Sequence, residues 1–124
     1  MASDKKTVVV GASPNPSRYA YRAAHMLTEY GHKMIPLSIK KGSVAGEEIM
    51  DLRKEPEIGE VDTLSLYIGP QHHEQWKDYL LGLSPNRIIF NPGTENQAFI
   101  REAEAKGIEV VEGCTLVMLQ VGTF

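Results

Sequence analysis

The sequence has almost no cysteine, and this scarcity limits the chemistry that the chain can carry. Cys114 is the only cysteine among 124 residues. An intramolecular disulfide is therefore excluded, and a metal site would have to be built from histidine and carboxylate side chains. No such metal site is predicted. The single thiol agrees with a reducing compartment.

The chain also lacks an excess of positive charge and any long apolar run. Its formal net charge is −3, whereas proteins that follow a nucleic-acid backbone usually carry a clustered positive excess. No apolar run approaches the roughly 20 residues that span a bilayer, and the start "MASDKKT" lacks the apolar centre of a signal peptide. We therefore expect a cytoplasmic protein that binds neither nucleic acid nor membrane.

Repeats and low-complexity segments are absent too. The secondary structure must therefore be inferred from stretches whose hydrophobic spacing is typical of a strand or of a helix. The length of 124 residues, with 42% hydrophobic and 23% charged residues, predicts a single domain over residues 1–124. Strands are expected at 6–12, 33–38, 62–68, 86–93 and 108–113. Helices are expected at 18–30, 71–83, 94–107 and 114–122, with a short one around 47–53. Thr94 and Gln97 fit a capping box at the start of the third of these helices.

Five strands that alternate with helices predict an α/β protein of the Rossmann-like type. The expected architecture is a doubly wound, parallel, five-stranded sheet with helices on both faces, in three α/β/α layers. Pro36 removes one backbone donor from the second strand and makes full pairing on both sides of it less favourable. Ligands of such sheets bind beyond the carboxyl ends of the strands, where the strand order reverses.

The turn after the first strand, "VVVGASPNPSR", is suited to an anion. Gly11 and Ala12 are small enough for the backbone to approach a ligand, and Ser13, Asn15 and Ser17 offer short polar side chains. Free amides and the positive end of the helix dipole favour a phosphate there, and Arg18 adds a positive charge. The alternative interpretation is that Ser17 only caps the helix while the prolines shape a tight loop.

The identity of the nucleotide depends on the segment "PLSIKKG" after the second strand. The first turn lacks the G-x-G-x-x-G spacing of dinucleotide sites and the Gly-Lys-Ser/Thr ending of a P-loop. A NAD site would place an acidic residue after the second strand, whereas this chain has Lys40 and Lys41. These lysines suit an extra ribose phosphate, such as the 2′-phosphate of NADP or the 3′-phosphate of coenzyme A. A solvated surface is the alternative.

Two segments carry a resemblance to a known family. "VVVGASPNPSRYAYRAAHMLTEYGHKMIPLS" and "FNPGTENQAFIREAEAKGIEVVEGC" make the chain similar to the small, single-domain CoA-binding proteins, whose fold resembles the CoA-binding domain of the succinyl-CoA synthetase alpha subunit. The resemblance extends from about residue 6 to residue 119. Its most specific parts are the "VGAS" turn with the "YR" that follows it, the "NPG" turn and the late cysteine.

The resemblance implies a set of cofactor-binding residues along the carboxyl edge of the sheet. The first turn would surround the CoA diphosphate, and the loop after the second strand would meet the adenosine, with Lys40 before Lys41 as the partner of the 3′-phosphate. The loop after the third strand would line the adenine or pantetheine path, and the "NPG" turn would lie nearer the thiol. The implied residues are Gly11, Ala12, Ser13, Asn15, Ser17, Arg18, Ser38, Lys40, Lys41, Tyr67, Ile68, Gly69, Asn91, Pro92 and Gly93.

Residues that could carry out catalysis are few, and none of them forms a predicted active site. His72 and His73 are adjacent, so on a helix their side chains diverge by roughly 100° and cannot share one site; both are expected at the surface. Cys114 is interpreted as a buried, inert thiol, with a reactive thiolate at a helix start as the alternative. No acid and base pair can be assigned.

These observations lead to one favoured function and two alternatives. We expect a binding module, rather than an enzyme, that holds a small-molecule nucleotide cofactor: coenzyme A or an acyl-CoA. The first alternative is an NADP-binding reductase or redox-sensor domain. The second is a ligand-free interaction domain that uses the apolar end "LVMLQVGTF". A homo-oligomer is compatible with each of them.

Overall fold

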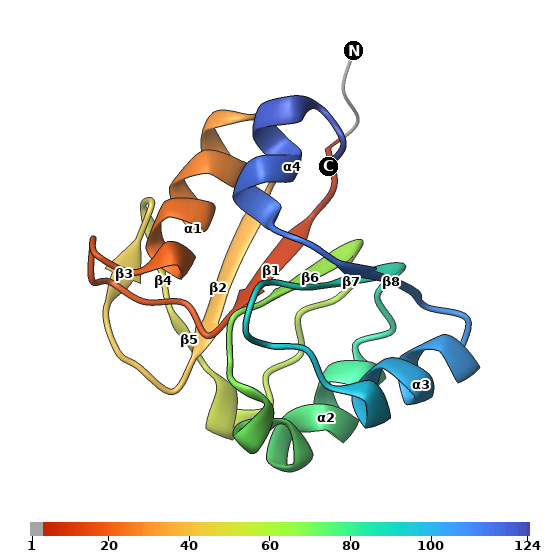
Figure 1. Ribbon diagram of the computed structural model, residues 1–124. Coiled ribbons are helices and arrows are strands. Elements are labelled where there is room, and N and C mark those ends of the chain that lie inside the picture. The colour runs from red at the N-terminus through yellow and green to blue at the C-terminus, as the bar shows by residue number, and fades with distance from the viewer. Residues whose placement is uncertain (1–3) are drawn as a thin grey trace.

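The computed structural model, which describes residues 4–124, is built on a sheet of six parallel strands in the order β5-β2-β1-β6-β7-β8 (Figure 1). The first three residues of the predicted domain, and of the "MASDKKT" segment, lie outside the described residues. The strands are β1 (Thr7–Val10), β2 (Met34–Ser38), β5 (Met50–Asp51), β6 (Thr63–Leu66), β7 (Arg87–Phe90) and β8 (Glu109–Glu112).

Helices cover both faces of this sheet, as the sequence predicts. Figure 1 shows α1 (Tyr19–Glu29) and α4 (Thr115–Val121) on one face, and α2 (His73–Gly82) and α3 (Gln97–Ala105) on the other. Two short 3-10 helices complete the chain, η1 (Leu52–Lys54) and η2 (Pro70–His72). The α/β, Rossmann-like class is thereby confirmed.

The predicted number of five strands and the predicted helix around 47–53 are wrong. That segment instead forms β4 (Glu47–Glu48), the edge strand β5 and η1, and β4 pairs with β3 (Ser43–Val44) as an antiparallel hairpin. The hairpin loop consists of Ala45 and Gly46, both at positive φ (51° and 81°), as a type I′ turn requires. Alanine is uncommon at such a position, and strands of two residues are too short to show a period. The hairpin and its short strands could therefore not be predicted from the sequence.

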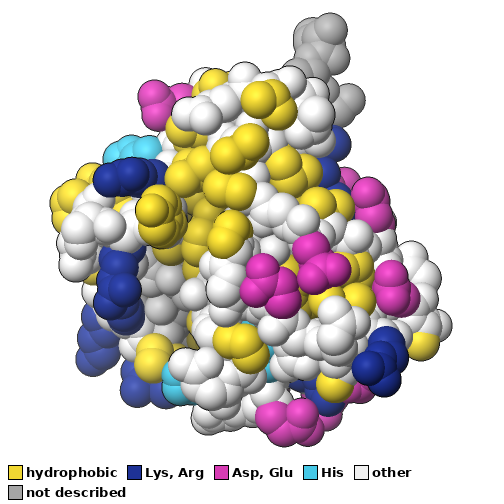
Figure 2. All heavy atoms as spheres, in the orientation of Figure 1, with side chains coloured by type: hydrophobic (Ala, Val, Ile, Leu, Met, Phe, Trp, Pro, Cys, Tyr) yellow, Lys and Arg dark blue, Asp and Glu magenta, His cyan; other side chains and the backbone are white. Residues whose placement is uncertain are grey.

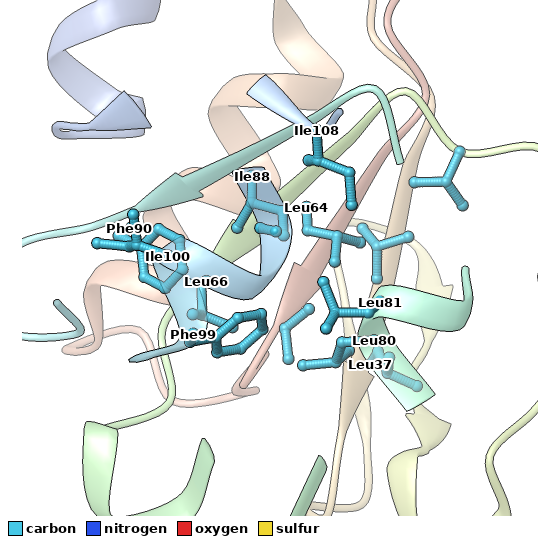
Figure 3. Packing of buried hydrophobic residues seen from close by; sticks show 14 of the residues in the cluster. Leu37, Leu64, Leu66, Leu80, Leu81, Ile88, Phe90, Phe99, Ile100 and Ile108 are labelled. Carbon is cyan, nitrogen blue, oxygen red and sulfur yellow. The ribbon is translucent and has the colours of Figure 1, made fainter. Parts of the chain in front are cut away.

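The two faces of the sheet have separate hydrophobic cores. On the α2 and α3 face, Leu64, Ile88, Phe90 and Phe99 are completely buried (Figure 3). On the other face, α1 packs its alanines and Leu27 against β1, and α4 adds Leu119. Strands β1, β6 and β7 are buried on both sides. This explains the continuous valine run of β1, whereas β6 alternates leucine with buried threonine and serine.

Two local predictions about pairing and capping have different outcomes. Pro36 lies opposite Val9 of β1, whereas β2 pairs with β5 only at Leu37 and Ser38, so the pairing on its outer side is incomplete as expected. The predicted capping box of α3 is wrong. Asn96 is the N-cap, and its side-chain oxygen accepts hydrogen bonds from the amides of residues 98 and 99.

Two features of the surface bear on partners. Within residues 4–124, no helix combines the length and the apolar character needed to cross a bilayer. Apolar side chains gather over α1 and α4 (Figure 2), where Tyr19, Val117 and Val121 are exposed. The homo-oligomer and the interaction domain stay predictions.

Candidate functional site

The candidate site lies where β1, β2, β6 and β7 end at one edge of the sheet. The chain leaves β1 for β2 on one side and later returns to β6 on the other side of β1. The connections after β1 and β6 therefore diverge and leave a crevice between them. This is the topological switch point at which open α/β sheets bind ligands.

The first turn approaches the neighbouring strand connection very closely, and Gly11 permits this approach. Gly11 has a φ of +92°, and its amide donates to the Leu37 carbonyl at 2.8 Å. A Cβ at this position would lie 3.0 Å from a methyl group of Ile68 and 3.2 Å from the Ile68 amide nitrogen. Both the backbone angle and the space therefore require glycine.

The rest of the turn is braced by its own polar side chains. The Ser13 hydroxyl accepts from the Asn15 amide, and the Asn15 side-chain oxygen accepts from both the amide and the hydroxyl of Ser17. Ser17 therefore does not cap α1. Arg18 occupies the N-cap position without a capping hydrogen bond. The amino-terminal end of α1 is consequently left open toward the crevice.

The crevice itself is a cleft of about 370 Å³, which we call the polar cleft. The first turn forms one wall, the loop after β2 forms another, and residues after β6 and β7 close it. Two positive side chains, Arg18 and Lys40, line it. The full set of lining residues is Gly11, Ser13, Ser17, Arg18, Tyr19, Ala20, Lys40, Tyr67, Pro92 and Thr94.

A hollow of about 270 Å³ adjoins the polar cleft and shares Tyr19, Tyr67 and Pro92 with it. We call it the Cys114 hollow, because the half-buried Cys114 thiol lines it together with Asn91 and Leu116. The thiol is therefore only partly buried, whereas a buried thiol was expected; its inertness stays a prediction. No residue in the lining of this hollow carries a formal positive charge. It suits an uncharged part of a ligand.

A second hollow, of about 210 Å³, lies beyond the Gly11–Ile68 contact, and we call it the Trp76 slot. Its walls come from the end of β2, η1, the loop after β6 and the start of α2. Aliphatic and aromatic side chains make up half of the lining, and Arg53 supplies one positive charge. The lining residues are Ser38, Ile39, Leu52, Arg53, Ile68, His72, Gln75 and Trp76.

A buried hydrogen-bond network fixes the floor of the Cys114 hollow. The Asn91 amide group donates to the Ser65 hydroxyl (3.1 Å) and to the Leu66 carbonyl (3.0 Å), and its oxygen accepts from the Thr115 amide (2.8 Å). The hydroxyls of Ser65 and Thr115 lie 2.8 Å apart. Asn91 is 1% exposed. It therefore connects β6 and β7 to the start of α4, which sets the position of Cys114.

Tyr67 stands between the polar cleft and the Cys114 hollow. Its hydroxyl is buried next to the hydroxyls of Ser65 and Thr115 but has no partner in good hydrogen-bond geometry among residues 4–124. Burial raises the pKa of Tyr67 well above its ordinary value, and the nearby Cys114 raises it further. The phenol thus stays protonated.

His73 is completely buried, so its expected place at the surface is wrong, whereas His72 is exposed as expected. The Nε2 atom of His73 lies 2.8 Å from the Ile68 carbonyl oxygen, and Nδ1 lies 3.2 Å from the side-chain amide nitrogen of Asn96. A carbonyl only accepts, so Nε2 carries the proton and Nδ1 accepts from Asn96. The neutral ring therefore joins the loop after β6 to the cap of α3.

Acid should weaken the fold through His73. Burial lowers the pKa of His73 below its ordinary value, so the unfolded chain takes up the proton first as the pH falls below about 6.5. The contribution of the neutral His73 ring to the unfolding free energy is present above that pH. It is lost as the pH falls through the pKa of His73 in the folded protein. We expect the unfolding free energy, measured with urea at pH 7.5 and pH 5.0, to fall less for His73→Gln than for the wild type.

His72→Gln is the matched control for this experiment because it changes the exposed neighbour. It should show the wild-type pH dependence. Burial also lowers the pKa of His32, so part of the acid sensitivity will persist in every variant. Equal pH dependence of the wild type and His73→Gln would contradict the assignment.

The structure brings many of the predicted site residues together, but not all of them. Seven line the polar cleft: Gly11, Ser13, Ser17, Arg18, Lys40, Tyr67 and Pro92. Ser38 and Ile68 line the Trp76 slot, and Asn91 lines the Cys114 hollow. The other five predicted residues line none of these three spaces. They are Ala12, which is fully buried, and Asn15, Lys41, Gly69 and Gly93.

Sequence reasoning missed several residues that line these spaces. Tyr19 and Thr94 lie just beyond the predicted turns, so a wider window around each strand end could have found them. Arg53 and Trp76 come from η1 and α2, far from any predicted strand end. No signal in the sequence placed them at the site.

Comparison with known proteins identifies relatives of this chain. The family model described as "CoA binding domain" matches residues 5–120. An uncharacterized protein of known crystal structure is 49% identical, with a TM-score of 0.95, over 99% of this chain and 100% of that one. No curated protein matches the chain.

Two further solved structures show the fold alone. A hypothetical protein from Pyrococcus horikoshii OT3 is 22% identical, with a TM-score of 0.83, over 95% of this chain and 83% of that chain. A Thermus thermophilus protein is 24% identical, also with a TM-score of 0.83, over 97% of this chain and 91% of that chain.

Proposed function

The chain belongs to the CoA binding domain family, and on that premise we propose that it binds coenzyme A or an acyl-CoA along the carboxyl edge of its sheet, without catalysing a reaction of its own. The observation that carries the proposal is the polar cleft at the open end of α1. Backbone amides, Arg18 and Lys40 converge there on a space that suits a diphosphate.

The two flanking spaces match the two ends of this ligand by their charge. CoA carries an adenosine with a 3′-phosphate at one end of its diphosphate and an uncharged pantetheine arm at the other. The Trp76 slot combines an aromatic side chain with Arg53, whereas the Cys114 hollow lacks a formal positive charge. We therefore place the adenosine toward the Trp76 slot and the thiol arm toward the Cys114 hollow.

The buried groups at the Cys114 hollow support this placement of the arm. The Tyr67 hydroxyl is buried without a well-placed partner, and a small shift of this side chain would let it donate to an amide or thioester carbonyl of the arm. Asn91 uses its side-chain amide for contacts within the protein. We assign it a positioning role beneath the arm rather than a direct contact.

A binding role without catalysis fits the chemistry of the polar cleft. None of its lining residues is a histidine, aspartate or glutamate, so the cleft lacks the side chains that most often act as general bases. The Ser13 hydroxyl accepts a hydrogen bond from the Asn15 amide, and no base activates it.

Ligand-induced stabilisation tests the proposal. We expect CoA to raise the melting temperature more than equal concentrations of dephospho-CoA, NADP or NAD, because a ligand that binds only the native state stabilises it with the logarithm of its saturation. A shift caused by NADP alone would favour the reductase or redox-sensor alternative. No shift with any of the four would favour an interaction domain without a ligand.

A further inference from the structure

The mouth of the Trp76 slot holds an arginine that is paired with a neighbouring carboxylate. The Arg53 Nε atom lies 3.0 Å from Asp51 Oδ1, and Nη2 lies 3.2 Å from Oδ2. Asp51 in turn caps η1, because its Oδ1 accepts from the Arg53 amide at 3.0 Å. The pairing is bidentate and orients the planar guanidinium.

This arrangement leaves one edge of the guanidinium free. Nη1 has no hydrogen-bond partner among residues 4–124, and the Arg53 side chain is 56% exposed. The Arg53 side chain is thus positioned by one carboxylate and still has N–H groups to donate. Its hydrogen bonds keep the pKa of Asp51 below its ordinary value, so the pair remains ionic.

We propose that Arg53 binds the 3′-phosphate of CoA at the mouth of the Trp76 slot and thereby sets a preference for CoA over dephospho-CoA. This inference rests on the proposed function. The 3′-phosphate is attached to the ribose beside the base, so it lies near the base and away from the pantetheine arm. Arg53 is the one side chain with a formal positive charge that lines the slot.

The lysines expected to meet this phosphate are placed differently. Lys40 lines the polar cleft with Arg18, where the diphosphate is proposed to bind. Lys41 lines none of the three spaces. Figure 2 shows Lys and Arg side chains gathered on the side of the molecule where Figure 1 places β3 and β4. Direct contact with an anion at the slot therefore falls to Arg53.

Calorimetric titration with CoA and dephospho-CoA can separate these roles. For the wild type we expect tighter binding of CoA, by about two- to fivefold, as one exposed charge-assisted contact provides. Arg53→Gln should remove this preference by weakening CoA binding alone. Lys40→Gln should weaken both ligands to a similar degree. Lys54→Gln, which removes a neighbouring charge that lines none of the three spaces, should keep the wild-type preference.

A double variant controls for Asp51, whose charge would be unpaired in Arg53→Gln and could itself repel the phosphate. In Asp51→Asn with Arg53→Gln both charges are gone, and the CoA preference should remain lost if Arg53 contacts the phosphate. A restored preference would overturn the inference. So would a preference that survives Arg53→Gln but is lost in Lys40→Gln.

The wild type alone separates this inference from the function on which it rests. Equal affinity for CoA and dephospho-CoA would overturn the role of Arg53 and leave CoA binding intact. Binding of neither ligand would contradict both.

Discussion

Gly11→Ala is expected to destabilise the protein by about 2–5 kcal/mol and to weaken CoA binding at least tenfold. The left-handed backbone angle of Gly11 disfavours any side chain by roughly 1–2 kcal/mol. The new Cβ would also crowd the Ile68 side chain and backbone, and overpacking of this kind costs about 1–3 kcal/mol. Relief of the crowding would move the first turn away from β6 and change the shape of the polar cleft. Urea unfolding and calorimetric titration measure the two effects.

Gly31→Ala provides a matched control for the backbone angle. Gly31 also has a positive φ, of 87°, but a Cβ there would meet nothing within 4 Å, and it follows the opposite end of α1. This variant should lose only the backbone cost of about 1–2 kcal/mol and bind CoA as the wild type does. If both glycine variants lose the same stability and keep their affinity, the close approach at Gly11 has no role in the site.

Asn91→Leu is expected to destabilise the protein by about 3–5 kcal/mol, because it leaves several buried polar groups without their partners. The Leu66 carbonyl and the Thr115 amide would each lose the side-chain partner that Asn91 supplies, and each such group costs about 1–3 kcal/mol. The start of α4 would no longer be tied to β7. We therefore also expect faster amide hydrogen exchange in α4 than in α1.

Thr115→Val tests the same network at a single bond. It removes the contact between the hydroxyls of Thr115 and Ser65 but keeps the backbone amide that donates to Asn91. The expected loss is about 1 kcal/mol. Equal losses for Asn91→Leu and Thr115→Val would show that the side-chain amide of Asn91 does not organise the floor of the hollow.

The sheet and the main turns could be predicted because their signals are local. The first strand is a continuous apolar run, the strand at 63–66 alternates leucine with small polar residues, and Gly11 and Gly31 mark the ends of a strand and a helix. The rule that ligands bind beyond the carboxyl ends of parallel strands then predicts that Lys40 and Arg18 lie at the same edge of the sheet. Both line the polar cleft.

The features that were missed depend on contacts between distant parts of the chain. His73 is buried because Ile68, Asn96 and Phe99 surround it, and no period in its own helix indicates this. Arg53 reaches the site through η1, within a segment of very short elements. Asn91 follows a predicted strand, yet its partners Ser65 and Thr115 are 26 and 24 residues away, so its internal role could not be inferred.

The most direct test of the account is an amide chemical-shift titration of the isotopically labelled protein with CoA. We predict saturable shifts for the amides of Gly11, Ser13, Arg18 and Lys40, with no change for Ala103 on the far face of the sheet. An unchanged first turn at a CoA concentration that saturates the protein, or shifts confined to α2 and α3, would contradict the claim that this turn holds the diphosphate.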